Sequence, residues 1–348
     1  MKLIKTIVSH IYKMAIGLVL FLYDKNLLKV NKIKTPLISI GNITVGGTGK
    51  SPMIIYVSKL LKSMDVSHGI ISRGYGRKSK KMTVVSNGHK ICSDIKNAGD
   101  EALVIAEKTN NIPVIVGDKV GGCNLIEKNF NPEVILVDDG FQTFRLHKDI
   151  NMLLVDLSSE INEYKLLPLG RLREPLSGIK RADCVIFTKT NFLSPSAKKI
   201  EEKILDLTQN KKIFRATFEL KVLKYQIKGG GFNSVSFDDI SGNNIAFSGI
   251  GNSTSFNQFI SENIKNIKNI FEFKDHCKYE SGEMKKMENS ISDPGDYNII
   301  TTLKDFVKVK NKISCWKNIY IVDAEHKIEN EEGFILFLKN QLKINLKK

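Results

Sequence analysis

Short apolar runs alternate with amphipathic segments along the first half of the chain. Runs of strand type cover residues 36–41, 68–72, 82–85, 113–116, 133–138, 151–155 and 183–188, and helical segments lie near 50–63, 99–109 and 118–129. Such alternation predicts an α/β fold with a mostly parallel sheet and helices on both faces. In sheets of this kind, ligands bind at the carboxyl ends of the strands.

The pattern changes near residue 215. Residues 214–220 alternate between apolar and polar like a half-buried strand, and they lead into a polar, glycine-rich stretch over 228–244. A chain of 348 residues also has the length of about two domains. We therefore expect a larger domain over 24–215 and a second, smaller α/β domain over 216–348.

The first 23 residues contain an apolar run of ten residues, 14–23, with lysines before and after it. Ten residues are too few to cross the hydrocarbon core, which takes about 20. No small-residue cleavage site of a signal peptide follows. We expect residues 1–23 to form an interfacial helix, with its apolar side in the acyl boundary and its lysines at the head groups. A core helix of the first domain is the alternative.

The charge of the chain is strongly basic, with a formal net charge of +16, but its distribution argues against a nucleic-acid partner. Only seven of the 53 basic residues are arginine, and the lysines are spread along the whole chain without interleaved aromatic residues. Five scattered cysteines form no CxxC pair, so neither a disulfide framework nor a zinc site is expected. The cysteines instead favour a reducing compartment.

A glycine-rich turn between the first strand and the first helix carries the strongest chemical signal. Strand, glycine loop and helix in this order form a P-loop, whose backbone N–H groups cradle phosphates. The predicted phosphate-binding residues are Thr44, Gly46, Gly47, Thr48, Gly49, Lys50 and Ser51. Lys50 would reach the outer phosphates, and the Ser51 hydroxyl would hold Mg²⁺. Thr44 stands where the strict pattern has glycine, and the glycines at 46 and 47 supply the backbone freedom.

Two acidic pairs follow predicted strands or begin predicted helices. Asp138 and Asp139 end the apolar run 133–138, as in a Walker B element, whose aspartate serves Mg²⁺. Asp100 and Glu101 begin a helix. From the local sequence alone, capping of that helix is the better explanation of Asp100.

Nine strings of the sequence together resemble the tetraacyldisaccharide 4′-kinase family of Gram-negative bacteria. They cover residues 41–52, 72–77, 99–102, 137–142, 170–175, 187–191, 247–252, 273–276 and 301–305, in the family's order and over nearly the whole chain. The resemblance implies an ATP- and Mg²⁺-dependent kinase of lipid A biosynthesis. Its reaction is transfer of the γ-phosphoryl group to the 4′-hydroxyl of a tetraacylated glucosamine disaccharide 1-phosphate.

The resemblance also implies roles for individual residues. Asp100 resembles the family's catalytic base, and His276 resembles the histidine paired with it. Lys50 and Arg171 complete the implied catalytic set, with Arg171 neutralising charge on the transferring group.

Further residues would bind the metal and the substrate. Ser51, Asp138 and Asp139 would organise Mg²⁺, and Arg73 and Tyr75 would face the lipid head group. Two departures from the family pattern leave contacts open: Cys277 stands where a second histidine is common, and Leu303 where glutamate is usual.

The implied acceptor is a membrane lipid, which gives the N-terminal helix a purpose. The helix would hold a soluble catalytic body at the cytoplasmic face of the bacterial inner membrane, as a peripheral, monotopic protein. We expect no nucleic-acid partner and no obligate protein partner.

Two other function classes remain as alternatives. A P-loop GTPase or metal-insertion chaperone is suggested by residues 184–191, a strand followed by a string close to a guanine-reading motif. The last residue of that string is Asn191, whose amide has one acceptor oxygen where the guanine-reading aspartate has two. A basic membrane-surface or nucleic-acid-binding protein without catalysis is the third reading.

Overall fold

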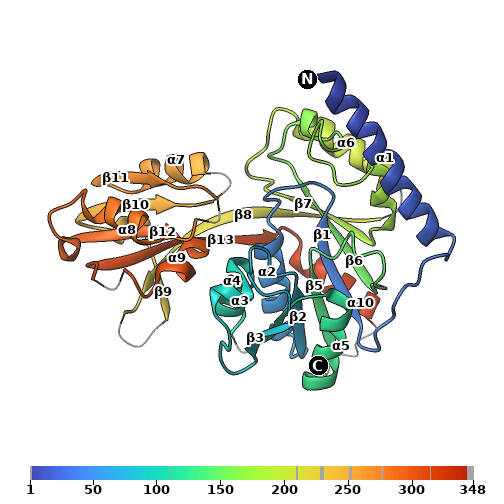
Figure 1. Cartoon of the computed structure of the whole chain (residues 1–348), viewed down its shortest axis with the longest axis horizontal. Coiled ribbons are helices and arrows are strands. Elements are labelled where there is room, and N and C mark those ends of the chain that lie inside the picture. Colours follow the sequence, from blue (N-terminus) through green and yellow to red (C-terminus); the bar gives the residue numbers. More distant parts are fainter. Residues whose placement is uncertain are drawn as a thin grey trace.

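The computed structural model describes residues 2–110, 112–208, 211–227, 231–250, 253–275, 277–313 and 315–342 (Figure 1). Its α-helices are α1 (Lys2–Asp24), α2 (Lys50–Ser63), α3 (Ile95–Ala98), α4 (Asp100–Thr109), α5 (Lys119–Phe130), α6 (Ala197–Thr208), α7 (Ser253–Asn263), α8 (Ser281–Glu288), α9 (Leu303–Val309) and α10 (Glu331–Leu342). Short 3-10 turns cover Ile161–Glu163, Leu176–Arg181, Phe237–Asp239 and Pro294–Asp296.

The strands are β1 (Leu37–Asn42), β2 (His68–Ser72), β3 (Thr83–Asn87), β4 (Pro113–Val116), β5 (Val134–Asp138), β6 (Ile150–Asp156), β7 (Cys184–Thr188), β8 (Lys212–Tyr225), β9 (Phe232–Val235), β10 (Asn243–Ser248), β11 (Ile267–Glu272), β12 (Tyr297–Thr302) and β13 (Asn318–Ile328). Strands β1 to β7 lie on the seven predicted runs, with ends shifted by at most two residues. Helices α2, α4 and α5 likewise match their predicted segments.

The thirteen strands of the described residues form one curled, mostly parallel sheet. Its order is β11-β10-β12-β13-β8-β7-β6-β1-β5-β2-β4-β3, with β9 paired to β8 off this path. Antiparallel pairing occurs between β3 and β4, β8 and β9, and β8 and β13. The predicted fold class is therefore confirmed.

Two long antiparallel strands, β8 and β13, connect the two parts of the sheet (Figure 1). The larger part contains β1 to β7, and the smaller part contains β10 to β12. β8 starts beside β7 and then pairs with β13 from Ala216 to Tyr225, while β13 pairs with β12 on its other side. The proposed division at residue 215 stays a prediction. Helix α10 follows β13 and packs in the core of the larger part through Phe334, Phe337 and Leu338.

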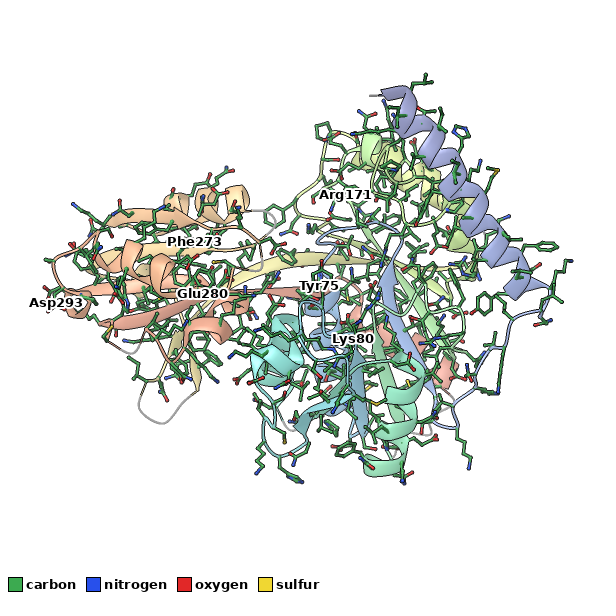
Figure 2. All side chains as sticks on the ribbon, in the orientation of Figure 1. Tyr75, Lys80, Arg171, Phe273, Glu280 and Asp293 are labelled. Carbon is green, nitrogen blue, oxygen red and sulfur yellow. The ribbon has the colours of Figure 1, made fainter. Side chains whose placement is uncertain are left out.

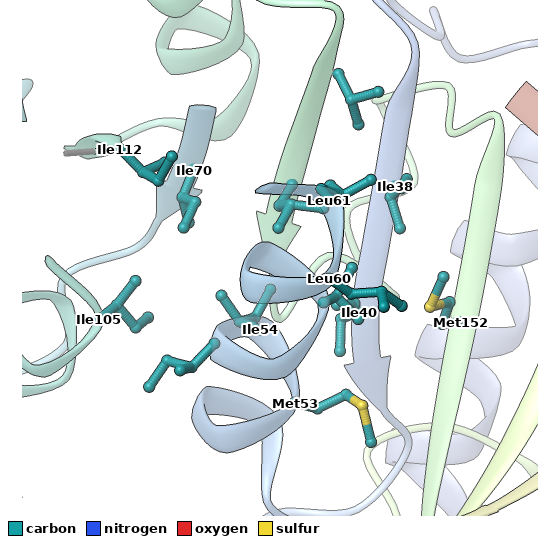
Figure 3. Packing of buried hydrophobic residues seen from close by; sticks show 14 of the residues in the cluster. Ile38, Ile40, Met53, Ile54, Leu60, Leu61, Ile70, Ile105, Ile112 and Met152 are labelled. Atoms are coloured by element: carbon teal, nitrogen blue, oxygen red, sulfur yellow. The ribbon is translucent and has the colours of Figure 1, made fainter. Parts of the chain in front are cut away.

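The core of the larger part fixes the direction of α2. Met53, Ile54 and Leu61 on this helix are buried against Ile38 and Ile40 of β1 (Figure 3). Each fully buried side chain of this size contributes about 1.5–3 kcal/mol relative to its exposed state. The start of α2 is therefore held at the carboxyl end of β1, where a phosphate loop needs it.

Helix α1 lies along the outside of the larger part (Figure 1). It is attached by the Ser9 hydroxyl, which donates to Leu166 O (3.3 Å), and by the Tyr12 hydroxyl, which donates to Arg173 O (2.5 Å). Large apolar side chains remain exposed on it: Leu3, Ile4, Ile7, Val8, Ile11, Met14, Leu18, Val19 and Phe21. By length and composition alone, α1 is the one described helix that could cross a membrane, through its 22-residue segment Leu3–Asp24, which is longer than the apolar run of ten residues within it.

Candidate active site

The loop between β1 and α2 has the backbone shape that its glycines permit. Gly46 has φ of 108° and Gly49, the N-cap of α2, has φ of 84°, both in the region that favours glycine. At the end of β1 the Asn42 amide donates to Thr48 Oγ1 (2.7 Å) and Thr44 Oγ1 (3.3 Å). Asn42 therefore ties both sides of the loop together.

The loop and the acidic pair meet, although about 90 residues separate them in the sequence. β1 and β5 are adjacent parallel strands, with Ile40 in register with Asp138. Lys50 Nζ donates to Asn42 Oδ1 (3.2 Å) and lies 3.8 Å from Asp139 Oδ1. Ser51 directly follows Lys50 in the first turn of α2 and is half-buried.

Arg173 is a site residue to which the sequence assigned no role. Its guanidinium donates to both carboxylate oxygens of Asp139 (2.9 and 2.8 Å) and to Asn42 O (2.7 Å). Burial alone would raise the pKa of the Asp139 carboxyl, but the bonds from Arg173 and the charge of Lys50 hold this pKa well below its usual range. The sequence does contain a signal for Arg173. The chain has only seven arginines, and four of them form two close pairs, Arg73 with Arg77 and Arg171 with Arg173.

Asp138 faces a different environment. It is buried, and its Oδ2 accepts a bond from the Ser72 hydroxyl (2.7 Å). Burial, and then the neighbouring Asp139 charge, raise the pKa of Asp138. Burial and the charge of Asp138 likewise raise the pKa of Glu101 at the start of α4. A cation between Asp138 and Glu101 would stabilise both carboxylates in their ionised forms, so this pair is suited to bind one.

Glu174 is a second carboxylate that the sequence did not single out. It is fully buried, and the Gln142 amide donates to its Oε1 (2.6 Å) and to Asn42 O (2.9 Å). Arg181 pairs with its other oxygen. Gln142, in the turn that follows the acidic pair, thus links Glu174 to the end of β1.

Asp100 lies where the smaller part of the molecule meets the larger part. This residue is 5% exposed at the start of α4, and Lys308 Nζ of α9 lies 3.4 Å from its Oδ2. Lys304 Nζ lies 3.9 Å from the same oxygen and 3.0 Å from Asp275 Oδ1. Asp100 Oδ1 also accepts the backbone N–H of Glu101 (2.9 Å), but the N-cap of α4 is Gly99, so Asp100 is not the cap that the local sequence suggests. His276, the predicted partner of Asp100, lies outside the described residues.

Arg171 and Tyr75 lie near the centre of the molecule, between the smaller part and α1 (Figure 2). The Arg171 guanidinium donates through Nε to Val45 O (2.7 Å) and packs so closely on Gly46 that a Cβ there would lie 1.6 Å from Nη2. The exposed Tyr75 side chain projects from a loop whose backbone abuts Gly99, where a Cβ would meet Tyr75 O at 2.5 Å. Arg73 is exposed on the same loop.

Asn191, the residue on which a guanine-reading motif would depend, is engaged with its own protein. Its Nδ2 donates to Phe218 O (3.0 Å), and its Oδ1 accepts from Phe218 N–H (2.9 Å). Both ends of the amide are therefore occupied. This arrangement argues against the GTPase alternative.

Comparisons with known proteins agree over the whole chain. The family model described as LpxK, tetraacyldisaccharide-1-P 4′-kinase, matches residues 1–343. A tetraacyldisaccharide 4′-kinase of Halothermothrix orenii is 33% identical over 92% of this chain and 88% of its own length, and one of Aquifex aeolicus is 33% identical over 93% and 94%. The crystal structure of Aquifex aeolicus LpxK described as an "apo" form in complex with ATP has 31% identity and a TM-score of 0.78, covering 96% of this chain and 97% of that one.

Proposed function

The chain belongs to the tetraacyldisaccharide-1-P 4′-kinase family, and from this membership we propose the roles of its residues in ATP-dependent phosphorylation of the 4′-hydroxyl of a tetraacylated glucosamine disaccharide 1-phosphate. The observation that carries the proposal is the meeting of the phosphate loop with the acidic pair, where Lys50 lies 3.8 Å from Asp139. A nucleotide kinase needs this arrangement, because the loop binds the phosphates and the acidic pair serves the metal.

The phosphates bind along the loop from Thr44 to Ser51. Lys50 reaches the outer phosphates, and Arg171, packed on Gly46, neutralises charge on the transferring group. Arg173 keeps Asp139 ionised and fixed beside Lys50. These residues orient the γ-phosphoryl group without any covalent contact to it.

The donor set near Asp138 suits a hard cation with oxygen ligands. Among the described residues, no cluster of three or more His, Cys, Asp or Glu side chains is close enough to hold a metal by itself. Mg²⁺ matches this arrangement, because it binds one or two carboxylates together with phosphate oxygens and water. Both Asp139 oxygens accept bonds from Arg173, so we assign the direct ligands to Ser51, Asp138 and Glu101. When bound there, Mg²⁺ would offset the negative charge of the ATP phosphates.

Asp100 is the proposed base that accepts the proton of the acceptor hydroxyl. Its burial and the ammonium groups of Lys304 and Lys308 keep the carboxylate in one position. The resemblance assigns His276 as its partner, and the adjacent Asp275 is held by Lys304. A base held this way accepts the proton as the oxygen attacks phosphorus.

Family membership implies a membrane-associated enzyme, and α1 supplies an apolar surface for that association. The bonds of Ser9 and Tyr12 tie one side of the helix to the catalytic body. A helix tied in this way suits the interface better than a span, so we propose peripheral attachment at the cytoplasmic face of the inner membrane. Arg73 and Tyr75 would then contact the lipid head group.

The test is product formation from ATP, Mg²⁺ and the disaccharide 1-phosphate in detergent micelles. The wild-type protein should form a bisphosphorylated lipid, and Lys50→Ala should reduce the rate by at least about 10³-fold, because the outer phosphates lose their positioning charge. Lys62→Ala, at the other end of α2, is the matched control and should react like wild type. A folded wild-type protein that forms no bisphosphorylated lipid would refute the proposal.

A further inference from the structure

Three successive carbonyl groups of the phosphate loop accept bonds from side chains outside the loop. Lys189 Nζ donates to Gly47 O (3.2 Å), and the Thr188 hydroxyl donates to Thr48 O (3.2 Å). His326 Nε2 lies 3.1 Å from Gly49 O. The donors come from the end of β7 and from β13, two strands that are not adjacent in the sheet.

The direction of these bonds matters because a trans peptide holds its C=O and N–H groups on opposite sides. The carbonyls of Gly47, Thr48 and Gly49 share their peptides with the N–H groups of Thr48, Gly49 and Lys50. Donors on the carbonyl side therefore turn these N–H groups toward the opposite side, which is the side that cradles phosphate. In this structure the Thr48 N–H donates to Gly46 O (3.1 Å), so the effect falls chiefly on the N–H groups of Gly49 and Lys50.

The two donors at the end of β7, Thr188 and Lys189, are themselves held in place. Thr188 is fully buried at the last position of β7. Lys189 has φ of 58°, an uncommon value for a side chain with a Cβ, and its ammonium pairs with the buried Asp156 carboxylate at 2.6 Å. A backbone held in a rare conformation at this place indicates a functional constraint.

His326 approaches the loop from the β8–β13 ribbon. It is 3% exposed, and a Cβ on Gly49 would lie 2.2 Å from its Nε2, so only glycine fits at that position. The Phe218 ring packs edge-on against the imidazole with ring centroids 5.2 Å apart. Burial lowers the pKa of His326 to about 4, so the ring is neutral at pH 7 and carries one N–H. Each ring nitrogen faces a carbonyl oxygen, Nδ1 that of Thr217 at 3.2 Å and Nε2 that of Gly49 at 3.1 Å, and the shorter distance favours the proton on Nε2.

We propose that Thr188, Lys189 and His326 are positioning residues that hold the phosphate loop in its ATP-binding shape. The proposal rests on the proposed function, in which ATP binds at this loop. It also gives a role to the string 187–191, which resembles a guanine-reading motif but here turns two side chains toward the loop and one, Asn191, toward Phe218. His326 adds a contact from the strand that continues into the smaller part of the molecule.

The decisive comparison is between two substitutions at Thr188. Thr188→Val removes the donor at nearly constant volume, whereas Thr188→Ser keeps a hydroxyl. We expect Thr188→Val to weaken Mg-ATP binding about five- to tenfold in calorimetric titrations, and Thr188→Ser to restore affinity to within about twofold of wild type. The KM for the lipid should stay unchanged in both variants. Thr190→Val is the matched control, because the Thr190 hydroxyl bonds to Glu329 and not to the loop.

A second pair of variants addresses His326. His326→Leu removes the donor and should weaken ATP binding about tenfold, while His326→Gln retains an amide donor and should recover most of that loss. Wild-type ATP affinity in Thr188→Val and His326→Leu would overturn the proposal. Equal losses in Thr188→Val and Thr188→Ser would also overturn it, because packing and not the donor would then be responsible.

The outcomes for the two proposals are separable. ATP binding by wild type without lipid phosphorylation would contradict the proposed function, while the affinity ratios between variants would still decide the positioning role. An absence of ATP binding by folded wild-type protein would contradict both.

Discussion

The carboxylates in the active site differ in their burial and in the partners that surround them: Asp138 is buried and Asp139 is partly exposed. Asp139 receives two bonds from Arg173, and its backbone carbonyl accepts a bond from Lys119. Asp138 has the Ser72 hydroxyl and a nearby acidic neighbour, Glu101. A buried charge is tolerated when it is paired. We therefore propose that Asp139 acts as a fixed anion and Asp138 as a metal ligand. The sequence pattern predicts both aspartates but cannot divide their roles, because Arg173 and Glu101 reach them only through the fold.

We predict that a change at Asp100 slows the chemical step without weakening nucleotide binding. Asp100→Asn keeps the shape and the bond from the Glu101 N–H but removes the proton acceptor. It should lower kcat by about 10²–10⁴-fold and change ATP affinity by less than about twofold. Steady-state kinetics and calorimetric ATP titration measure the two quantities. Glu107→Gln, on the same helix and paired with Lys310, is the control. A parallel loss of ATP binding would make Asp100 a structural or metal residue.

Because His326 is buried, the free energy of unfolding of the protein should depend on pH. The pKa of His326 is lowered to about 4 by burial, whereas the unfolded residue titrates near 6.5. The unfolded chain therefore binds the proton first as the pH falls, and the native state loses stability below about pH 6.5. Between pH 7 and pH 5 this one group should remove about 2 kcal/mol from the free energy of unfolding.

Urea denaturation of wild type and His326→Gln at both pH values measures that contribution. The wild type should lose about 2 kcal/mol more than the variant on acidification, because the amide does not titrate. An equal loss in the two proteins would mean that His326 is not neutral and buried in the folded state.

At the scale of elements, the first seven strands were predictable, whereas β9 to β13 and most of the pairings between strands were not. Continuous apolar runs bounded by polar residues mark β1, β2 and β4 to β7, since strands buried on both faces carry no alternation. The antiparallel pairing of β8 with β13 joins segments about 100 residues apart, and no local pattern announces such a partner. Contacts that depend on this pairing, such as His326 at the phosphate loop, were therefore absent from the prediction.

The prediction at the scale of elements concerns membrane association through helix α1. Removal of residues 2–23 should move the protein from the membrane to the soluble fraction, because the exposed apolar side chains leave with the helix. Sedimentation with lipid vesicles measures the change. Tyr12→Phe is the control, since it loses the bond to Arg173 O but keeps the apolar surface, and it should still sediment with vesicles. Unchanged sedimentation of the shortened chain would refute the interfacial role of α1.

At the scale of the whole molecule, the site is assembled from both parts of the sheet. The larger part supplies the phosphate loop and the carboxylates near Asp138, and the smaller part supplies Lys304 and Lys308 beside Asp100. The loop and the acidic pair were predictable because each follows a strand, and carboxyl ends of parallel strands share one edge. The position of Lys308 beside Asp100 was not predictable, because only the curl of the sheet along β8 and β13 brings α9 to α4 (Figure 1).

The most direct measurement is the location of the new phosphate on the lipid after reaction with ATP and Mg²⁺. Mass spectrometry and phosphorus NMR of the product should show one phosphate gained for each ATP consumed, on the 4′-oxygen of the disaccharide 1-phosphate. Consumption of ATP with an unchanged lipid, or a phosphate on any other oxygen, would contradict the account.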